Sequence, residues 1–172
     1  TAPVANSLQA VGMFSAVNGM FFGYNGTSFG VMHRHDGNFE IRRLTINTAS
    51  TAAATATVTL NGTAYTASVT NASAAINAQE IAAGLRAGAA GALWSIQSVG
   101  SAVVFMFKGD GPKSGTYSLS VSSGALAGTF TQDTAGVTKT EDWTAQDDWN
   151  VDKCAWLDTT KGNIFKLEYA YL

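Results

Sequence analysis

The sequence is poor in charge and in cysteine, and each shortage excludes a class of protein. Charged residues make up 13% of the 172 residues, roughly half of the usual fraction of about 25%, and the formal net charge is −2. This balance gives no electrostatic basis for binding nucleic acid or an anionic membrane surface. The one cysteine, Cys154, excludes a disulfide framework or a thiolate metal cluster within one chain.

Long apolar segments are also missing. No apolar run reaches the roughly 18 residues of a membrane-spanning helix, so we expect no membrane span. Hydrophobic residues still make up 46% of the chain, which is enough to build a buried core and argues against disorder. The chain starts on Thr1 and stops on Leu172 inside an alternating segment without a polar tail. We therefore expect the natural polypeptide to continue past Leu172.

The few charged residues are unevenly distributed, which predicts an inserted module. Residues 48–137 contain only six of the 22 charged side chains. Such a shift in composition is typical of one domain inserted into another. We predict a module at 48–137 and a host domain made of 1–47 plus 138–172. The alternative is a single sheet-rich domain with an uncharged middle.

The middle segment has the pattern of a small α+β module. Two alternating stretches, 55–60 and 63–69, flank Asn61-Gly62, the dipeptide that best supplies a type I′ hairpin turn. A helix follows, for which we expect Asn77 as the N-cap and Glu80 as its capping-box partner. Further strands are expected at 93–99, 102–108, 117–121 and 129–132. This order predicts one helix packed on an antiparallel sheet.

The flanks have the pattern of an all-β domain. Strands are expected at 11–17, 29–33 and 39–46, and again from Asn163 to Leu172. Bulky aromatic residues are concentrated in these flanks, as the filling of a two-sheet sandwich requires. The predicted fold class is therefore mainly β (α+β), an antiparallel β-sandwich host domain with an inserted module of one helix on an antiparallel sheet.

The pair His33 and His35 is a candidate metal site. Residues i and i+2 of a strand point to the same face, so both imidazoles can reach one ion. Two ligands are too few alone, but a trimer with this strand at its axis would supply six. The alternative is that both histidines are half-exposed residues without a ligand.

An acidic run surrounds the C-terminal tryptophans. Glycoside hydrolysis requires a pair of carboxylates, but nothing in the sequence fixes the separation of these groups, and we favour a solvated loop. The run consists of Asp142, Asp147, Asp148 and Asp152.

Aromatic residues of the C-terminal flank are candidate contacts with a glycan or with another subunit. Aromatic rings stack on the C–H faces of sugars, although tryptophan more often fills cores and interfaces. The last strand also presents alternate apolar side chains on one face up to the end of the chain, so we expect a homo-oligomer with this region near the contact. The candidates are Trp143, Trp149, Trp156, Tyr169 and Tyr171.

No motif marks a catalytic nucleophile. The sequence contains no Gly-x-Ser-x-Gly elbow, and Cys154 has no histidine near it in sequence. The loop at 109–115 lacks the adjacent Gly-Lys-Ser/Thr of a phosphate loop. We therefore expect that the protein is not an enzyme and binds no cofactor.

Several stretches resemble structural proteins of tailed bacteriophages. They are residues 22–31, 40–46, 56–65, 78–83, 149–152 and 161–165. The middle stretches are similar to small β-β-α-β modules inserted in tail and fibre proteins. These motifs are made of turn and packing residues, so the resemblance transfers no catalytic residue.

The resemblance implies a structural protein of the virion: a tail, fibre or capsid-decoration component. Its expected partners are further copies of itself, other virion proteins and a host glycan. The alternative function is an extracellular carbohydrate-binding module or glycan hydrolase that uses the segment 142–156.

Overall fold

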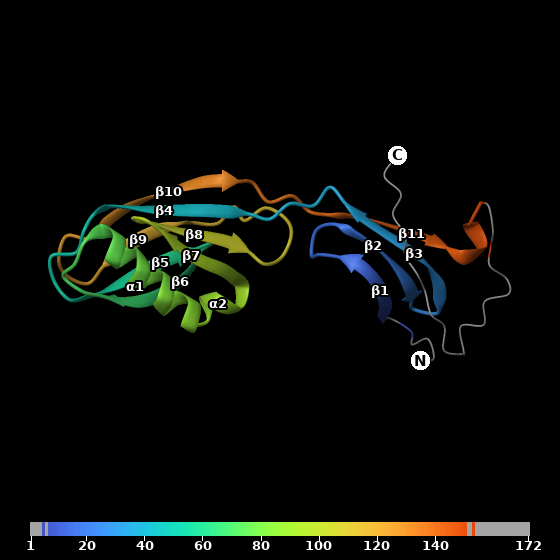
Figure 1. Cartoon of the computed structure of the whole chain (residues 1–172), viewed down its shortest axis with the longest axis horizontal. Coiled ribbons are helices and arrows are strands. Elements are labelled where there is room, and N and C mark those ends of the chain that lie inside the picture. The colour runs from blue at the N-terminus through green and yellow to red at the C-terminus, as the bar shows by residue number, and fades with distance from the viewer. Residues whose placement is uncertain (1–4, 6, 151–152, 154–172) are drawn as a thin grey trace. The chain divides into compact units, whose positions relative to one another are not determined.

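The computed structural model describes Ala5, residues 7–150 and Lys153 (Figure 1). The chain divides into two compact units. The first unit consists of residues 1–36 and 139–172, and the second of residues 37–138. Both are built on antiparallel sheets, and a helix packs on the sheets of the second. The predicted class, mainly β with one helix packed on antiparallel strands, is confirmed.

The described part of the first unit forms one four-stranded sheet in the order β1-β2-β3-β11. A short 3-10 helix, η1 (Gln146–Asp148), follows the last strand. The strands are β1 (Leu8–Phe14), β2 (Gly19–Asn25), β3 (Ser28–His35) and β11 (Thr140–Ala145).

The second unit contains two sheets. One has the order β10-β4-β8-β7 and the other β6-β5-β9, and β4 and β10 run side by side in Figure 1. The strands of the first are β4 (Ile41–Thr48), β7 (Trp94–Val99), β8 (Ala102–Phe107) and β10 (Ala127–Thr134). Those of the second are β5 (Ala54–Leu60), β6 (Thr63–Val69) and β9 (Ser118–Val121).

Helix α1 (Ala74–Ala87) closes the core of the second unit, and the short helix α2 (Ala90–Leu93) follows it. α1 packs on β6 and on β4, β7 and β8, so it contacts strands of both sheets. Ile81 and Leu85 of α1 are at most 1% exposed. The hydrophobic cluster that they join also includes Leu44, Val58, Leu60, Ile96 and Phe105.

The hairpin between β5 and β6 has the predicted turn. Asn61 has φ 51° and Gly62 has φ 84°, and both positive angles are those that a type I′ turn requires. Thr63 pairs with Leu60 directly across the turn. The local sequence therefore sets the register of this hairpin.

The N-cap prediction for α1 was wrong. Helix α1 begins one turn earlier, and the side chain of Ser73 accepts a hydrogen bond from the Ile76 N–H. Asn77 is instead fully buried. Its Oδ1 accepts a hydrogen bond from the Ser50 N–H at 2.8 Å, and its Nδ2 donates to the Thr70 carbonyl at 2.9 Å. Asn77 therefore joins the helix to two loops.

The boundary between the units lies before β4. The charge distribution predicts residues 39–46 in the host domain, but β4 pairs with β8 and β10 inside the second unit. Strand β2 was also missed, because its two glycines resemble turn residues. Gly23 in fact pairs with Ala10 and Gly30 in the middle of the sheet. No helix among the described residues is long and apolar enough to cross a membrane.

Candidate functional site

The sheet of the first unit has two unlike faces. Cross-strand pairing puts Phe21, Met32 and Trp143 on one face, where Phe21 is 0% and Met32 is 6% exposed. The side chains that alternate with them on β2 and β3 are not buried. We call this second side the aromatic face, and it carries Met20, Phe22, Tyr24, Phe29 and Val31.

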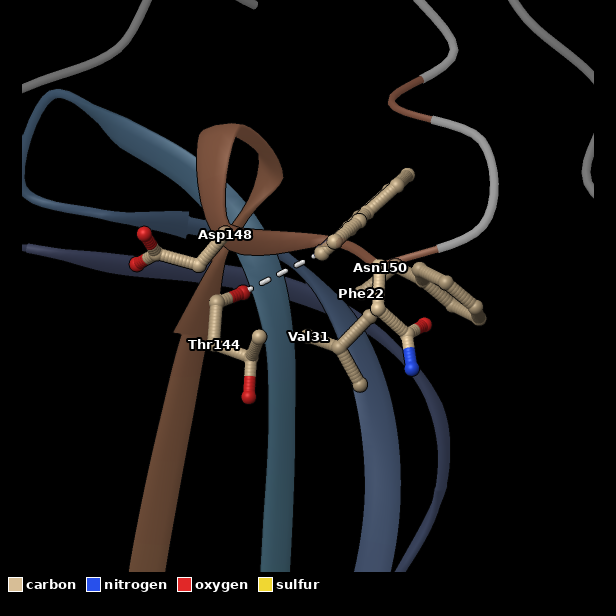
Figure 2. A pocket seen from close by; sticks show the side chains of 6 residues that line it. Phe22, Val31, Thr144, Asp148 and Asn150 are labelled. Atoms are coloured by element: carbon tan, nitrogen blue, oxygen red, sulfur yellow. Dashed lines mark hydrogen bonds between the residues drawn. The ribbon is translucent and has the colours of Figure 1, made fainter.

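A pocket of about 450 Å³ opens on the aromatic face. Side chains of β2, β3, β11, η1 and the two residues that follow η1 surround it (Figure 2). Its lining residues are Phe22, Val31, Thr144, Asp148, Trp149 and Asn150.

Trp149 is held in place by hydrogen bonds and ring packing. Its backbone N–H donates to the Gln146 carbonyl at 3.2 Å, which closes η1. Its indole Nε1 donates to the Thr144 carbonyl at 3.4 Å, the dashed line of Figure 2. Its ring also lies 6.3 Å from that of Phe29, centroid to centroid. The indole is therefore fixed beside the pocket, with its polar atom already paired.

The pocket combines an apolar surface with three polar side chains. Phe22, Val31 and Trp149 supply the apolar surface. The polar groups are a hydroxyl, a carboxylate and an amide, from Thr144, Asp148 and Asn150. Such a combination suits a sugar ring, which has C–H faces and hydroxyl groups, or an apolar side chain of another protein.

A second group of functional side chains lies on the same face of the sheet, where β3 and β11 pair. The rings of His33 and His35 stack at 4.6 Å between centroids. Nε2 of His35 lies 2.8 Å from an Asp142 carboxylate oxygen, and Nδ1 lies 2.8 Å from one of Asp36. The bonds to Asp142 and Asp36 raise the pKa of His35 above its ordinary value.

The candidate residues predicted from the sequence are separated by the structure. Trp143 lies on the face of the sheet that carries Phe21 and Met32, whereas Trp149 lines the pocket on the aromatic face. Within the acidic run, Asp142 bonds to His35, while Asp148 lines the pocket. Asp147 lies in η1 and is not among the residues that line the pocket. The other predicted residues fall outside the described part of the chain: Asp152, Trp156, Tyr169 and Tyr171.

Strand β1 is apolar and exposed, a feature that the sequence patterns above do not predict. Val11 is 58% and Met13 is 64% exposed, and Leu8 and Phe14 are each about half exposed. β1 is an edge strand and pairs with β2 along one side only within the described sheet. The sequence contains one indication of an uncharged surface here, because the first charged residue of the whole chain is Arg34.

Comparison with known proteins gives little sequence similarity. No protein-family model and no curated protein matches the chain. Among solved structures, a match is found to the D1-D2-D3 domains of the flagellar cap protein FliD from Escherichia coli, with a TM-score of 0.45 and 15% identity. The match covers 84% of this chain and 50% of that one, so the chain spans about half the length of the structure it matches.

Proposed function

We propose that this chain is a structural, non-enzymatic subunit of a bacteriophage particle: a tail, fibre or capsid-decoration component. In this proposal it works by packing against further copies of itself and against other virion proteins. The resemblance of residues 22–31 and 56–65 to structural proteins of tailed phages supports an origin in a bacteriophage particle. The observation that carries the proposal is the exposed, uncharged edge of β1.

Soluble proteins usually protect a sheet edge with charged residues, prolines or bulges. Strand β1 has the sequence Leu-Gln-Ala-Val-Gly-Met-Phe and contains neither a charge nor a proline. Four of its apolar side chains are also exposed, Leu8 and Phe14 on one face of the sheet and Val11 and Met13 on the other. β1 therefore has the properties of a strand that pairs with another strand in an assembly.

A second copy of the same chain is the occupant that we propose for this edge. Two β1 strands can pair antiparallel about a two-fold axis, which brings the same uncharged side chains together without like-charge repulsion. The net charge of −2 for the whole chain opposes such contact only weakly. Burying each exposed apolar side chain would contribute up to about 1.5–3 kcal/mol.

Sedimentation of the 172-residue chain tests this proposal. We expect the wild type to form an oligomer at micromolar concentration and Val11→Lys to dissociate it. Val99→Lys is the matched control, because Val99 is also 58% exposed but lies on β7 of the second unit. A wild type that remains monomeric at tens of micromolar, or equal effects of the two substitutions, would refute the proposal.

The pocket beside Trp149 supports a second function, attachment to a glycan of the host surface. An indole fixed by its Nε1 hydrogen bond presents its ring to a sugar, and Asp148 and Asn150 can bond to hydroxyl groups. We expect Trp149→Ala to abolish glycan binding on an array without changing the oligomeric state. Tyr65→Ala, which alters an aromatic residue of the second unit, should leave binding intact. Absence of binding by the wild type would refute this second function.

A further inference from the structure

We propose that His33, His35 and Asp142 bind one divalent transition-metal ion within a single chain. One ligand atom from each residue lies within 4.8 Å of the other two. His33 and Asp142 are direct cross-strand partners, and His35 lies two residues along β3 on the same face. The third ligand therefore comes from the neighbouring strand, and the site needs no symmetry axis.

The arrangement around His35 is the one that metal-binding histidines usually have. A ligating imidazole typically donates its other N–H to a carboxylate, which fixes the tautomer and the orientation of the ring. Asp36 is placed to accept this bond from Nδ1 at 2.8 Å, which leaves Nε2 for the ion. Asp36 is thus a positioning residue and not a ligand.

Rotation of the side chains can bring the three ligand atoms to the distances that one ion requires. Metal–ligand bonds of about 2.0–2.2 Å place the ligand atoms of a tetrahedral site about 3.3 Å from one another. His35 Nε2 and the Asp142 carboxylate are 2.8 Å apart, so these two atoms must separate by about 0.5 Å to bind the ion. The remaining movement belongs to His33, whose side chain is exposed and can turn about its χ angles.

The charges around the cluster favour a cation. Asp36 and Asp142 both contact His35, so two carboxylates face the imidazoles. The basic side chains near these residues in sequence, Arg34 and Lys139, form ion pairs with Glu141, at 2.5 Å and 3.8 Å. Arg34 and Glu141 pair across the opposite face of the sheet.

The ligand set indicates the class of ion. Imidazole nitrogens suit zinc, nickel and copper, whereas magnesium and calcium prefer oxygen ligands alone. Zinc accepts three protein ligands and completes its shell with water. Such an ion would connect β3 to β11, whose bonded residues His35 and Asp142 are 107 positions apart in sequence. It would act as a clamp where the chain leaves and re-enters the first unit.

Zinc titration of the metal-stripped 172-residue chain tests the proposal. The chain contains only two histidines, so the two imidazole signals in an NMR spectrum of ¹³C-labelled protein report on the site directly. We expect one zinc ion per chain, shifts of both histidine signals and a higher melting temperature with zinc. Asp142→Asn and His33→Gln should each lower the affinity at least tenfold. Asp36→Asn should lower it by about 10–100-fold, as outer-shell carboxylates commonly do.

Two control variants isolate the site. Glu141→Gln makes the same change of charge as Asp142→Asn on the same strand but on the opposite face, and should leave zinc affinity unchanged. Cys154→Ser removes the one thiol and should also retain binding. The proposal is overturned by a zinc affinity that Asp142→Asn leaves unchanged, by one ion per three chains, or by no binding to the wild type at 100 µM zinc.

Discussion

Glu40 Oε1 lies 2.6 Å from Arg42 Nε in a buried ion pair at the start of β4. The Glu40 side chain is 0% exposed and also accepts hydrogen bonds from Gln132 Nε2 at 2.8 Å and from the Gly136 N–H at 2.7 Å. Burial raises the pKa of this carboxyl. The bonds from Gly136 and Gln132 and the charge of Arg42 together outweigh that effect, so the pKa lies below its ordinary value. Glu40 is therefore ionised at neutral pH and ties β4 to β10 and the loop after it.

Glu40→Ala should destabilise the second unit strongly, because it leaves the charge of Arg42 without its buried partner. Breaking such a pair costs about 3–5 kcal/mol, which urea unfolding at pH 7 would measure. Asp133→Ala is the control, since its ion pair with Arg43 is partly exposed and should contribute about 0.2–1 kcal/mol. Equal losses from the two substitutions would contradict the structural role of Glu40.

Glu80 should make the free energy of unfolding depend on pH in the acidic range. Its carboxylate accepts hydrogen bonds from Thr70 Oγ1 at 2.6 Å, from the Thr70 N–H at 3.0 Å and from Asn77 Nδ2 at 3.1 Å. Burial raises the pKa of Glu80, but the bonds from Thr70 and Asn77 outweigh it and lower the pKa below its ordinary value of 4.5. A lowered folded-state pKa stabilises the fold fully above the unfolded-state value, and this contribution is lost as the pH falls through the folded-state value.

The expected result is a pH-dependent difference between the wild type and Glu80→Gln. The wild type should have the higher free energy of unfolding at pH 7, and the difference should shrink as the pH is lowered from 5 to 3. Urea unfolding at each pH gives both free energies. A difference that stays constant over this range would show that the charge of Glu80 does not contribute.

Gly30 is required for the packing of β11 on β3. A Cβ atom at this position would lie 2.8 Å from Cζ2 of Trp143 and would also clash with the Thr144 carbonyl oxygen. Gly30→Ala should therefore destabilise the first unit by about 1–3 kcal/mol, measured by urea unfolding. Gly88→Ala is the control, because a Cβ there meets its nearest atom at 3.5 Å and should change the stability by less than about 1 kcal/mol.

Local sequence patterns predicted the strands and turns of the fold better than they predicted the roles of individual side chains. Asn61-Gly62 and the alternating strands around it specify their hairpin through short-range geometry, and the structure has that hairpin. The buried role of Glu40 depends on Gln132 and Gly136, more than 90 residues away, and no local pattern indicates it.

The candidate site has the same division between local and distant information. The sequence placed His33 and His35 on one face of a strand, because alternation is a local property. Their carboxylate partner Asp142 is 107 residues from His35, so only the pairing of β3 with β11 reveals it. The sequence also grouped Trp143 with Trp149, although η1 lies between them and they occupy opposite faces of the sheet.

The last prediction concerns the independence of the second unit. Every member of its main hydrophobic cluster lies between Leu44 and Phe130. The chain enters and leaves this unit through paired backbone bonds, because Asn38 and Val137 each donate an N–H to the other's carbonyl at 3.0 Å. Residues 37–138 expressed alone should therefore fold, and should show a cooperative thermal transition by circular dichroism.

A shorter fragment, 48–137, is the matched comparison, because it follows the boundary that charge distribution alone predicts. It lacks nearly all of β4, the strand between β8 and β10, and with it Leu44 and Ile46, which are at most 3% exposed. Losing a central strand and its core side chains should leave this fragment without a cooperative transition. If both fragments fold equally well, β4 is dispensable and the charge-based boundary is the better one; if neither folds, the second unit depends on the rest of the chain.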